Sequence, residues 1–267
     1  MSQELQYRIS DAANAGVEAA DQGDLLAAEV FMRESVSLFT DVELNNQQDV
    51  FAYFTCLKNL GDVLADMSAT PESEPFRVSA VEATRALFEA DPVAHAEHHV
   101  KSLLALAKVY RGPICYVIPA HESDDYRPRI IRNLDQMAAV RRQRILNHDE
   151  WPLAWIPAPH WHLKSERVLE EAIRTTRTLR ATSSDWTPYL ALALNLLGEA
   201  NILGERHGAA LAPLNEAEDL YIELVSHGAS SDALDMLADT RKLLATARNP
   251  TPAFVVFDEN FSLRPGR

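Results

Sequence analysis

The sequence contains little cysteine and little glycine, and it has no long hydrophobic run. Its 267 residues include nine glycines and two cysteines, Cys56 and Cys115. Two isolated cysteines exclude a disulfide framework and a paired-cysteine metal motif. No stretch has the length of a membrane span, so no membrane partner is expected. The opening residues, MSQELQYRISDAANAG, carry charges and lack the apolar core of a secretory signal, which predicts a cytoplasmic protein.

The common catalytic patterns are also missing. The sequence holds no glycine-rich phosphate loop and no nucleophile elbow. The acidic pairs Asp124-Asp125 and Glu170-Glu171 are adjacent in sequence, so on a helix they diverge instead of converging on a substrate. We therefore expect a non-catalytic protein that needs no cofactor.

Acidic residues outnumber basic ones, and the excess is unevenly placed. The formal net charge is −14; residues 1–126 hold 8 Lys and Arg against 21 Asp and Glu, and residues 127–267 hold 17 against 18. An acidic protein is a poor general nucleic-acid binder, because affinity for phosphates grows with cationic contacts. Residues 127–144 are locally basic and offer two interpretations, a solvated face or a helix that docks an acidic partner such as the N-terminal half of a second copy in a homodimer.

Apolar residues recur at spacings of three and four, which predicts helices along most of the chain. The expected helices cover 4–22, 25–40, 47–67, 76–90, 94–111, 128–147, 163–181, 187–204, 208–226 and 231–247. Two segments rich in Pro, His and aromatic residues, 111–128 and 147–163, interrupt this pattern as irregular insertions. The sequence therefore predicts one helical domain over 1–247, followed by an extended tail over 248–267.

Small residues repeat along the chain. Residues 14–39 match residues 196–221 at a constant offset of 182, which places Gly16 on Gly198, Ala28 on Ala210 and Ser35 on Ala217. A third copy begins around Gly61, with an insertion expected at 68–75, and a fourth has Ala107 in the glycine position. The spacings of 45, 46 and 91 between these positions place a degenerate copy near residue 152. Small residues let two antiparallel helices approach closely where they cross.

The repeat resembles the tetratricopeptide repeat (TPR), and its longer period is most similar to the repeats of kinesin-light-chain type and of actinobacterial proteins. NAGVEAADQGD and LNLLGEANILGE are similar to the first helix and turn of that motif, and ALFEADP resembles its end. The resemblance implies an all-α solenoid of about five antiparallel helix hairpins, one of them degenerate. It also implies a scaffold or regulatory protein that binds a peptide or protein segment in a concave groove.

The family's groove-facing positions give candidate binding residues in this chain: Lys58, Asp62, Lys101, Lys108, Arg111, Asn195 and Glu199. Lysines in a groove are suited to anchoring a carboxylate, but Asp62 and Ala105 stand where the family's chaperone-binding members have Asn and Arg. The alternative is that Lys58 and Asp62 form an ordinary ion pair between residues i and i+4 on an exposed helix face.

The histidines support a different hypothesis, an enzyme or a sensor of a small ligand or metal. His95 and His99 lie one helical turn apart, and His160 and His162 lie in the second insertion. These four residues are candidate ligands for a divalent metal such as zinc or iron, although their spacing matches no specific metal motif. The pocket would then be formed by the His- and Trp-rich insertions.

Overall fold

The computed structural model describes residues 1–40, 42–67, 70–110, 116–118, 129–131, 161–228, 231–250, 256–257 and 263–264. The described helices fall into two compact units, which we call unit 1 and unit 2. None of the described helices is both long enough and apolar enough to cross a membrane.

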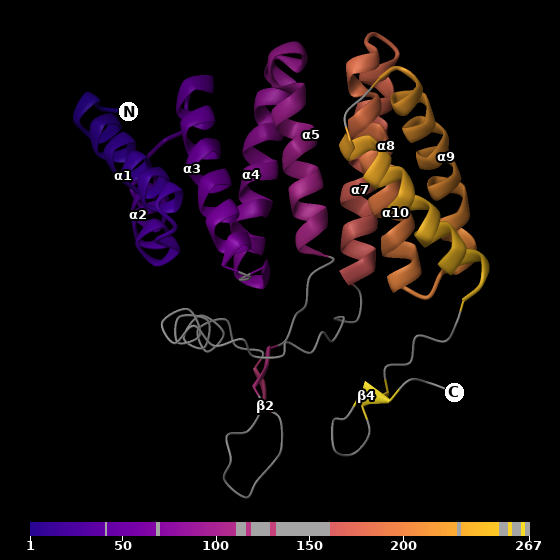
Figure 1. Ribbon diagram of the computed structural model, residues 1–267. Helices are drawn as coiled ribbons and strands as arrows, with labels where there is room; N and C mark the ends of the chain where they lie inside the picture. The colour runs from indigo at the N-terminus through magenta and orange to yellow at the C-terminus, as the bar shows by residue number, and fades with distance from the viewer. Residues whose placement is uncertain are drawn as a thin grey trace, which may run out of the picture. The chain divides into compact units, whose positions relative to one another are not determined.

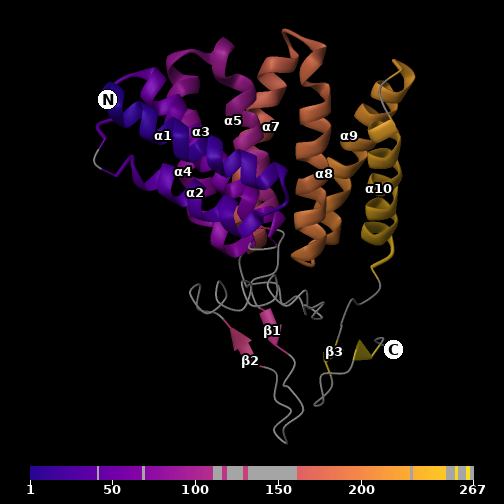
Figure 2. The same cartoon turned by 60° about the vertical axis from the view of Figure 1, so that its left-hand side comes forward.

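Unit 1 contains five helices that pack against one another in chain order (Figures 1 and 2). They are α1 (Gln3–Asp21), α2 (Leu25–Ser37), α3 (Gln47–Asp66), α4 (Thr70–Ala90) and α5 (Pro92–Val109). Side-chain caps fix several helix starts: the Asp24 carboxylate accepts a hydrogen bond from the Ala27 N–H, and the Asp91 carboxylate accepts one from the Ala94 N–H. A capped start satisfies backbone donors that have no partner within the helix.

Unit 2 contains four helices and a short 3-10 turn, which also pack in chain order (Figure 1). They are α7 (Trp161–Arg180), the turn η1 (Ser184–Trp186), α8 (Thr187–Leu203), α9 (His207–Ser226) and α10 (Ser231–Arg248). The buried core of this unit includes Leu169, Leu190, Leu214 and Leu244.

The described strands form two small ladders. Strand β1 (Tyr116–Ile118) pairs antiparallel with β2 (Arg129–Ile131), and β3 (Val256–Phe257) pairs with β4 (Leu263–Arg264). Strand β2 lies where the sequence predicts the start of a helix over 128–147, so that start was wrong. The β-branched pair Ile130-Ile131, opposite Val117 and Tyr116, favours a strand at this position.

In three hairpins, the two helices cross where the first helix has a glycine. A Cβ added at Gly16 would lie 2.8 Å from Met32, and one at Gly198 would lie 2.3 Å from Leu214. A Cβ added at Gly61 would lie 2.7 Å from the Nε atom of Arg77. In all three hairpins, α1–α2, α3–α4 and α8–α9, the facing residue stands sixteen positions after the glycine. The residues that repeat in the sequence therefore occupy equivalent positions where the two helices of each hairpin pack together.

The insertion expected at 68–75 is wrong. Ser73 and Ala80 stand twelve and nineteen residues after Gly61, as Ala28 and Ser35 do after Gly16, and all four side chains are buried. The residues assigned to the insertion instead include the first turns of α4, which begins at Thr70 rather than near residue 76 and contains Pro75.

The structure describes the second helix of the degenerate repeat, which is α7. In α7, Ser165, Leu169 and Ala172 are buried with the same spacing as Ala28, Met32 and Ser35 in α2. The glycine position that precedes them by this spacing is residue 153, outside the described residues. Helix α7 therefore has the pattern of the second helix of a hairpin.

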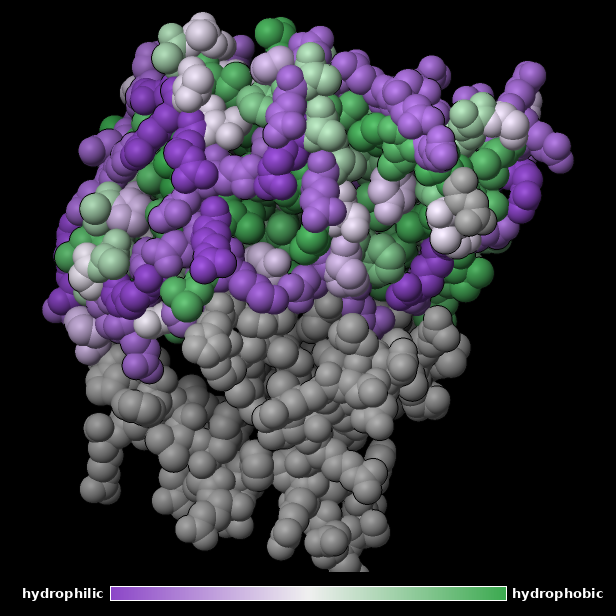
Figure 3. All heavy atoms as spheres, turned by 180° about the vertical axis from the view of Figure 1, so that it is seen from behind, coloured by the Kyte–Doolittle hydropathy of each residue, from purple (hydrophilic) through white to green (hydrophobic). Residues whose placement is uncertain are grey.

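The packing confirms the expected fold class, an all-α succession of antiparallel helix hairpins, within the described part of each unit. The single domain expected over 1–247 stays a prediction. On the face shown in Figure 3, hydrophilic side chains separate the hydrophobic ones into small areas.

Candidate functional site

The first helices of the hairpins in unit 1 share an exposed face. On α3, the residues Phe51, Thr55, Lys58 and Asp62 recur at spacings of four, three and four, which places them on one side of the helix. Helix α1 is the first helix of its hairpin in the same way, and α5 follows α4 as α3 follows α2. We call the exposed surface of α1, α3 and α5 the first-helix face.

A hollow of about 390 Å³ lies on this face between α1 and α3. Its apolar wall and floor come from small and medium side chains, including Ile9, Ala13, Val17, Ala52 and Cys56. Its polar lining consists largely of uncharged amides and hydroxyls: Gln6, Ser10, Asn14, Gln48, Thr55 and Asn59. Such a lining offers both donors and acceptors of hydrogen bonds above an apolar surface.

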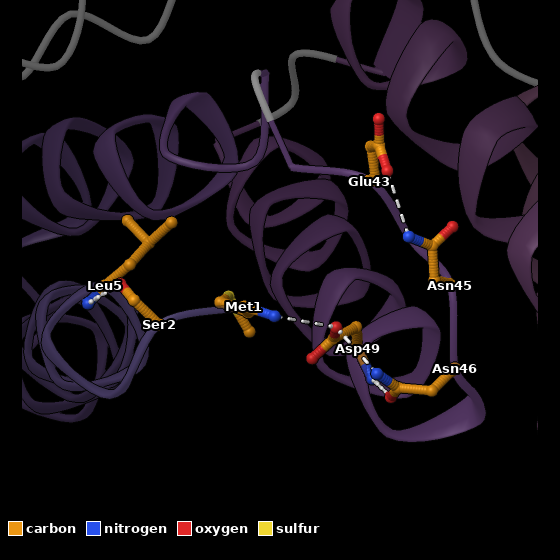
Figure 4. A network of polar contacts seen from close by, with 7 residues as sticks. All are labelled: Met1, Ser2, Leu5, Glu43, Asn45, Asn46 and Asp49. Carbon is orange, nitrogen blue, oxygen red and sulfur yellow. Dashed lines mark hydrogen bonds and ion pairs between the residues drawn. The ribbon is translucent and has the colours of Figure 1, made fainter.

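Two residues of the lining, Met1 and Asp49, belong to a polar network at the start of α3 (Figure 4). The Asp49 carboxylate lies 3.4 Å from the Met1 amine and accepts a hydrogen bond of 2.9 Å from the Asn46 amide. The Asn46 side chain in turn accepts the Asp49 N–H at 2.8 Å and caps the helix. The buried Asp49 carboxylate is thus neutralised and bonded, which fixes the edge of the hollow.

Polar residues that line the hollow recur at the same 45-residue spacing as the repeat. Ser10 and Thr55, and likewise Asn14 and Asn59, are separated by 45 residues, as are Gly16 and Gly61. The Asn14 amide lies 3.4 Å from the Ser10 hydroxyl, whereas the Asn59 side chain forms no hydrogen bond within the described residues. Sequence reasoning missed these residues, although the 45-residue spacing was the signal that identifies them.

Cys56 lies at the bottom of the hollow with only 3% of its surface exposed. Burial raises the pKa of its thiol, and the hydrogen bond with Ser35 opposes that change. The thiol is therefore protonated at neutral pH and acts as a small apolar group.

Lys58 and Asp62 lie together on the first-helix face, 2.8 Å apart and about half exposed. The second oxygen of Asp62 accepts a hydrogen bond of 2.7 Å from Arg77 of α4. Arg77 occupies the crossing position that holds Met32 and Leu214 in other hairpins, and its side chain is only 9% exposed. Its guanidinium passes over Gly61 to reach the face. The Asp62 carboxylate therefore lies between two cations, which an ordinary pair on one helix does not provide.

The other candidate lysines lie on α5. Lys101 is paired with Glu97 at 2.5 Å, and Lys108 is exposed. Arg111 lies outside the described residues. None of Lys58, Asp62, Lys101 and Lys108 lines the hollow. Their role as binding residues stays a prediction.

The candidates in unit 2 are not part of the first-helix face. Asn195 is 4% exposed and its amide donates a hydrogen bond of 2.5 Å to the Thr240 hydroxyl of α10. This buried contact does not fit the expected groove-facing position, because α10 covers the side of α8 on which Asn195 lies. Glu199 is half-buried on α8.

His95 and His99 have different neighbours in the structure, and their role as metal ligands stays a prediction. His99 is buried, stacks on Phe88 of α4 at 5.3 Å and contacts the Thr84 hydroxyl, whereas His95 lies beside Phe51 of α3. No group of three or more His, Cys, Asp or Glu side chains suited to a metal occurs among the described residues. His162 packs against Gly204 in unit 2, and His160 lies outside the described residues, as does most of both insertions.

Unit 2 has its own surface hollows between α7 and α9, of about 470 and 460 Å³. Both are lined by Arg177 and Glu216, which pair across them at 2.6 Å, and Arg180 pairs with Glu223 at 2.8 Å. These pairs connect α7 with α9 and neutralise Arg177 and Arg180.

The comparisons with known proteins assign the chain to no family. No protein-family model and no curated protein matches the chain. Among solved structures, the chain is similar to the crystal structure of the de novo designed helical repeat protein DHR64, with 12% identity and a TM-score of 0.34 over 92% of this chain and 93% of that chain. A TM-score this low carries no argument. The assignment as a helical repeat protein rests on the packing of the chain's own hairpins.

Proposed function

We propose that the protein is a non-catalytic scaffold that binds an extended protein segment across the first-helix face of unit 1. The observation that carries this proposal is the hollow between α1 and α3, with in-register amide and hydroxyl side chains above an apolar floor. The resemblance of the repeat to the TPR family supports the same proposal.

The chemistry of the hollow suits an extended backbone. Such a backbone presents an N–H and a C=O at each non-proline residue, about 3.3 Å apart along the chain. Asn14 and Asn59 each carry an amide that can donate and accept, and Ser10 and Thr55 add hydroxyls. The apolar floor can cover side chains of the segment, so the backbone supplies affinity and the side chains supply specificity.

Random-peptide display on the full chain tests this function. Peptides of twelve residues would be selected on the protein and their affinities measured against the double variant Asn14→Ala/Asn59→Ala. We expect binding to weaken about tenfold or more, because two backbone hydrogen bonds contribute about 0.5–1.5 kcal/mol each. The matched control, Asn45→Ala/Asn249→Ala, removes two exposed amides that do not line the hollow and should bind as the original chain does.

Two results would contradict the proposal. One is a failure to enrich any peptide over the heat-unfolded protein. The other is equal affinity of the selected peptides for the original chain and for Asn14→Ala/Asn59→Ala.

A further inference from the structure

Helix α10 has the pattern of the first helix of a further hairpin. Four of its buried residues stand 184 positions after four buried residues of α3. They are Ala233, Thr240, Leu244 and Ala247, which correspond to Asp49, Cys56, Leu60 and Val63. The same offset places Ala245 at the position of Gly61. Helix α10 therefore carries a small residue where a second helix would cross it.

The crossing side of α10 is exposed. It consists of four residues at spacings of four, three and four: Leu234, Ala238, Arg241 and Ala245. In α3, the equivalent residues Phe54 and Leu57 are buried against α4. Among the described residues, no helix follows α10 to cover its crossing side, and Leu234 is 53% exposed.

Helix α9 adds apolar surface beside the crossing side. Arg241 pairs with Glu218 of α9 at 2.7 Å, which draws its guanidinium toward α9. Ile222 stands four residues after Glu218, so it lies on the side of α9 that faces α10, and it is 44% exposed. Burial of such exposed aliphatic surface is favourable. The crossing side therefore has small and aliphatic residues that a further helix can cover.

The charges of α10 are divided between its two halves. The first half carries Asp232, Asp235 and Asp239, and the second half carries Arg241, Lys242 and Arg248. Asp235 is exposed and forms no ion pair within the described residues, and Lys242 pairs with Asp239 at a largely exposed position. Two antiparallel copies of this helix place the acidic half of each against the basic half of the other. Their helix dipoles also oppose one another favourably.

We propose that the crossing side of α10 pairs antiparallel with α10 of a second copy and forms a two-fold symmetric dimer. Leu234 then packs on the partner's Ala245, a large residue on a small one, as Leu214 faces Gly198 within the α8–α9 hairpin. Asp235 lies at the same level as the partner's Lys242. A two-fold contact repeats both interactions, because each surface meets its own copy.

The charge pattern favours a second copy over the chain's own tail as the occupant. The apolar run of the tail, residues 253–257, carries no charge, so it offers nothing to the divided charges of α10. The crossing side is also distinct from the basic segment 127–144 and from the first-helix face. The dimer therefore does not depend on the proposed function. It carries two first-helix faces, so a ligand that presents two copies of a bound segment gains avidity.

Sedimentation velocity of the full chain tests the dimer. A contact made mainly by one helix of each copy is small, so we expect a dissociation constant of about 10–100 µM. Leu234→Asp should weaken dimerisation about tenfold or more, because it places a carboxylate in the apolar contact. Leu203→Asp is the matched control, since Leu203 is 49% exposed in the same unit but lies on α8. It should dimerise as the original chain does.

A charge exchange tests the antiparallel arrangement. Asp235→Lys and Lys242→Asp should each weaken dimerisation about threefold, because each places like charges together across the two-fold axis. The double variant Asp235→Lys/Lys242→Asp should restore most of the affinity, since it exchanges the two charges in both copies. Additive weakening in the double variant would contradict the antiparallel arrangement.

Three further results would overturn the proposal. One is a monomer at every concentration up to about 200 µM, well above the expected dissociation constant. Another is a dimer that Leu234→Asp leaves unchanged, which would place the contact elsewhere. The third is a monomer in which Leu234→Asp, but not Leu203→Asp, makes residues 253–257 more susceptible to chymotrypsin. That result would identify the chain's own tail as the occupant.

Discussion

At the residue scale, the three crossing glycines face different side chains. Gly198 faces the branch carbon of Leu214, whose position is fixed by the surrounding core. Gly16 faces the terminal methyl and sulfur of Met32, an unbranched side chain that can move. The same substitution should therefore have different consequences at these two glycines.

We predict that Gly198→Ala lowers the free energy of unfolding by about 1–3 kcal/mol, because an added methyl at 2.3 Å from the Leu214 Cγ overpacks the hairpin. Gly16→Ala should change it by less than about 1 kcal/mol, since the gain in helix propensity offsets the shift of Met32. Urea unfolding of the two variants measures the difference. Equal destabilisation would show that the facing side chain does not decide the effect.

The contribution of His98 to the stability of the fold depends on pH. Burial lowers the pKa of its imidazole; Glu97 opposes this change, and His95, Lys101 and Lys58 add to it. The folded state therefore favours the neutral ring. The stabilisation from His98 is complete above its ordinary pKa of 6.5 and is lost as pH falls below that value toward the lowered pKa.

We accordingly expect the melting temperature to fall between pH 7 and pH 5, and to fall less in His98→Gln. Thermal unfolding followed by circular dichroism at both pH values measures the two changes. His227→Gln, which removes an exposed imidazole in unit 2, should keep the pH dependence of the original chain. An unchanged pH dependence in His98→Gln would contradict the assignment.

At the element scale, the hairpin turns follow the same register as the crossings. Gly23, between α1 and α2, has a φ of +79°, and Glu205, between α8 and α9, has a φ of +58°. These residues are separated by 182, the offset of the repeat itself. The turn requires a left-handed residue in both hairpins, and only the first hairpin supplies glycine. Glu205 therefore holds backbone strain.

Glu205→Gly should raise the free energy of unfolding by about 0.5–1 kcal/mol, because relief of the left-handed strain exceeds the added flexibility of the unfolded chain. Chemical denaturation measures the gain. Glu205→Ala removes the same exposed carboxylate but keeps the Cβ, so it should show no comparable gain. Similar stabilisation by both variants would attribute the effect to charge and not to the turn.

The elements also show how far the sequence alone leads. Apolar spacing predicted the described helices, and the small residues predicted which pairs form hairpins. The start of α4 was not predicted, because Pro71 and Pro75 suggested a linker, although Ser73 already stood at the small-residue position that Ala28 holds in α2. The strand at Arg129–Ile131 escaped it as well, since its partner β1 lies more than ten residues earlier in the chain.

At the scale of the whole molecule, the candidate site was harder to predict than the fold. Asn14 and Asn59 were readable from the 45-residue spacing, but their use as a lining appears only when α1 lies beside α3. The burial of Asn195 depends on α10, 45 residues away at Thr240, and no local pattern reveals that contact. Arg77 replaces the apolar residue that the repeat favours, so its bond to Asp62 was also hidden.

The packing in chain order has a mechanical consequence. Among the described helices, each contacts mainly its neighbours in sequence, and few contacts join distant parts of the chain. Under a pulling force on the ends of a unit, such a stack can lose one hairpin while the next keeps its own contacts. Extension would then proceed in steps of a hairpin's length. Each unit would then extend as a compliant spring.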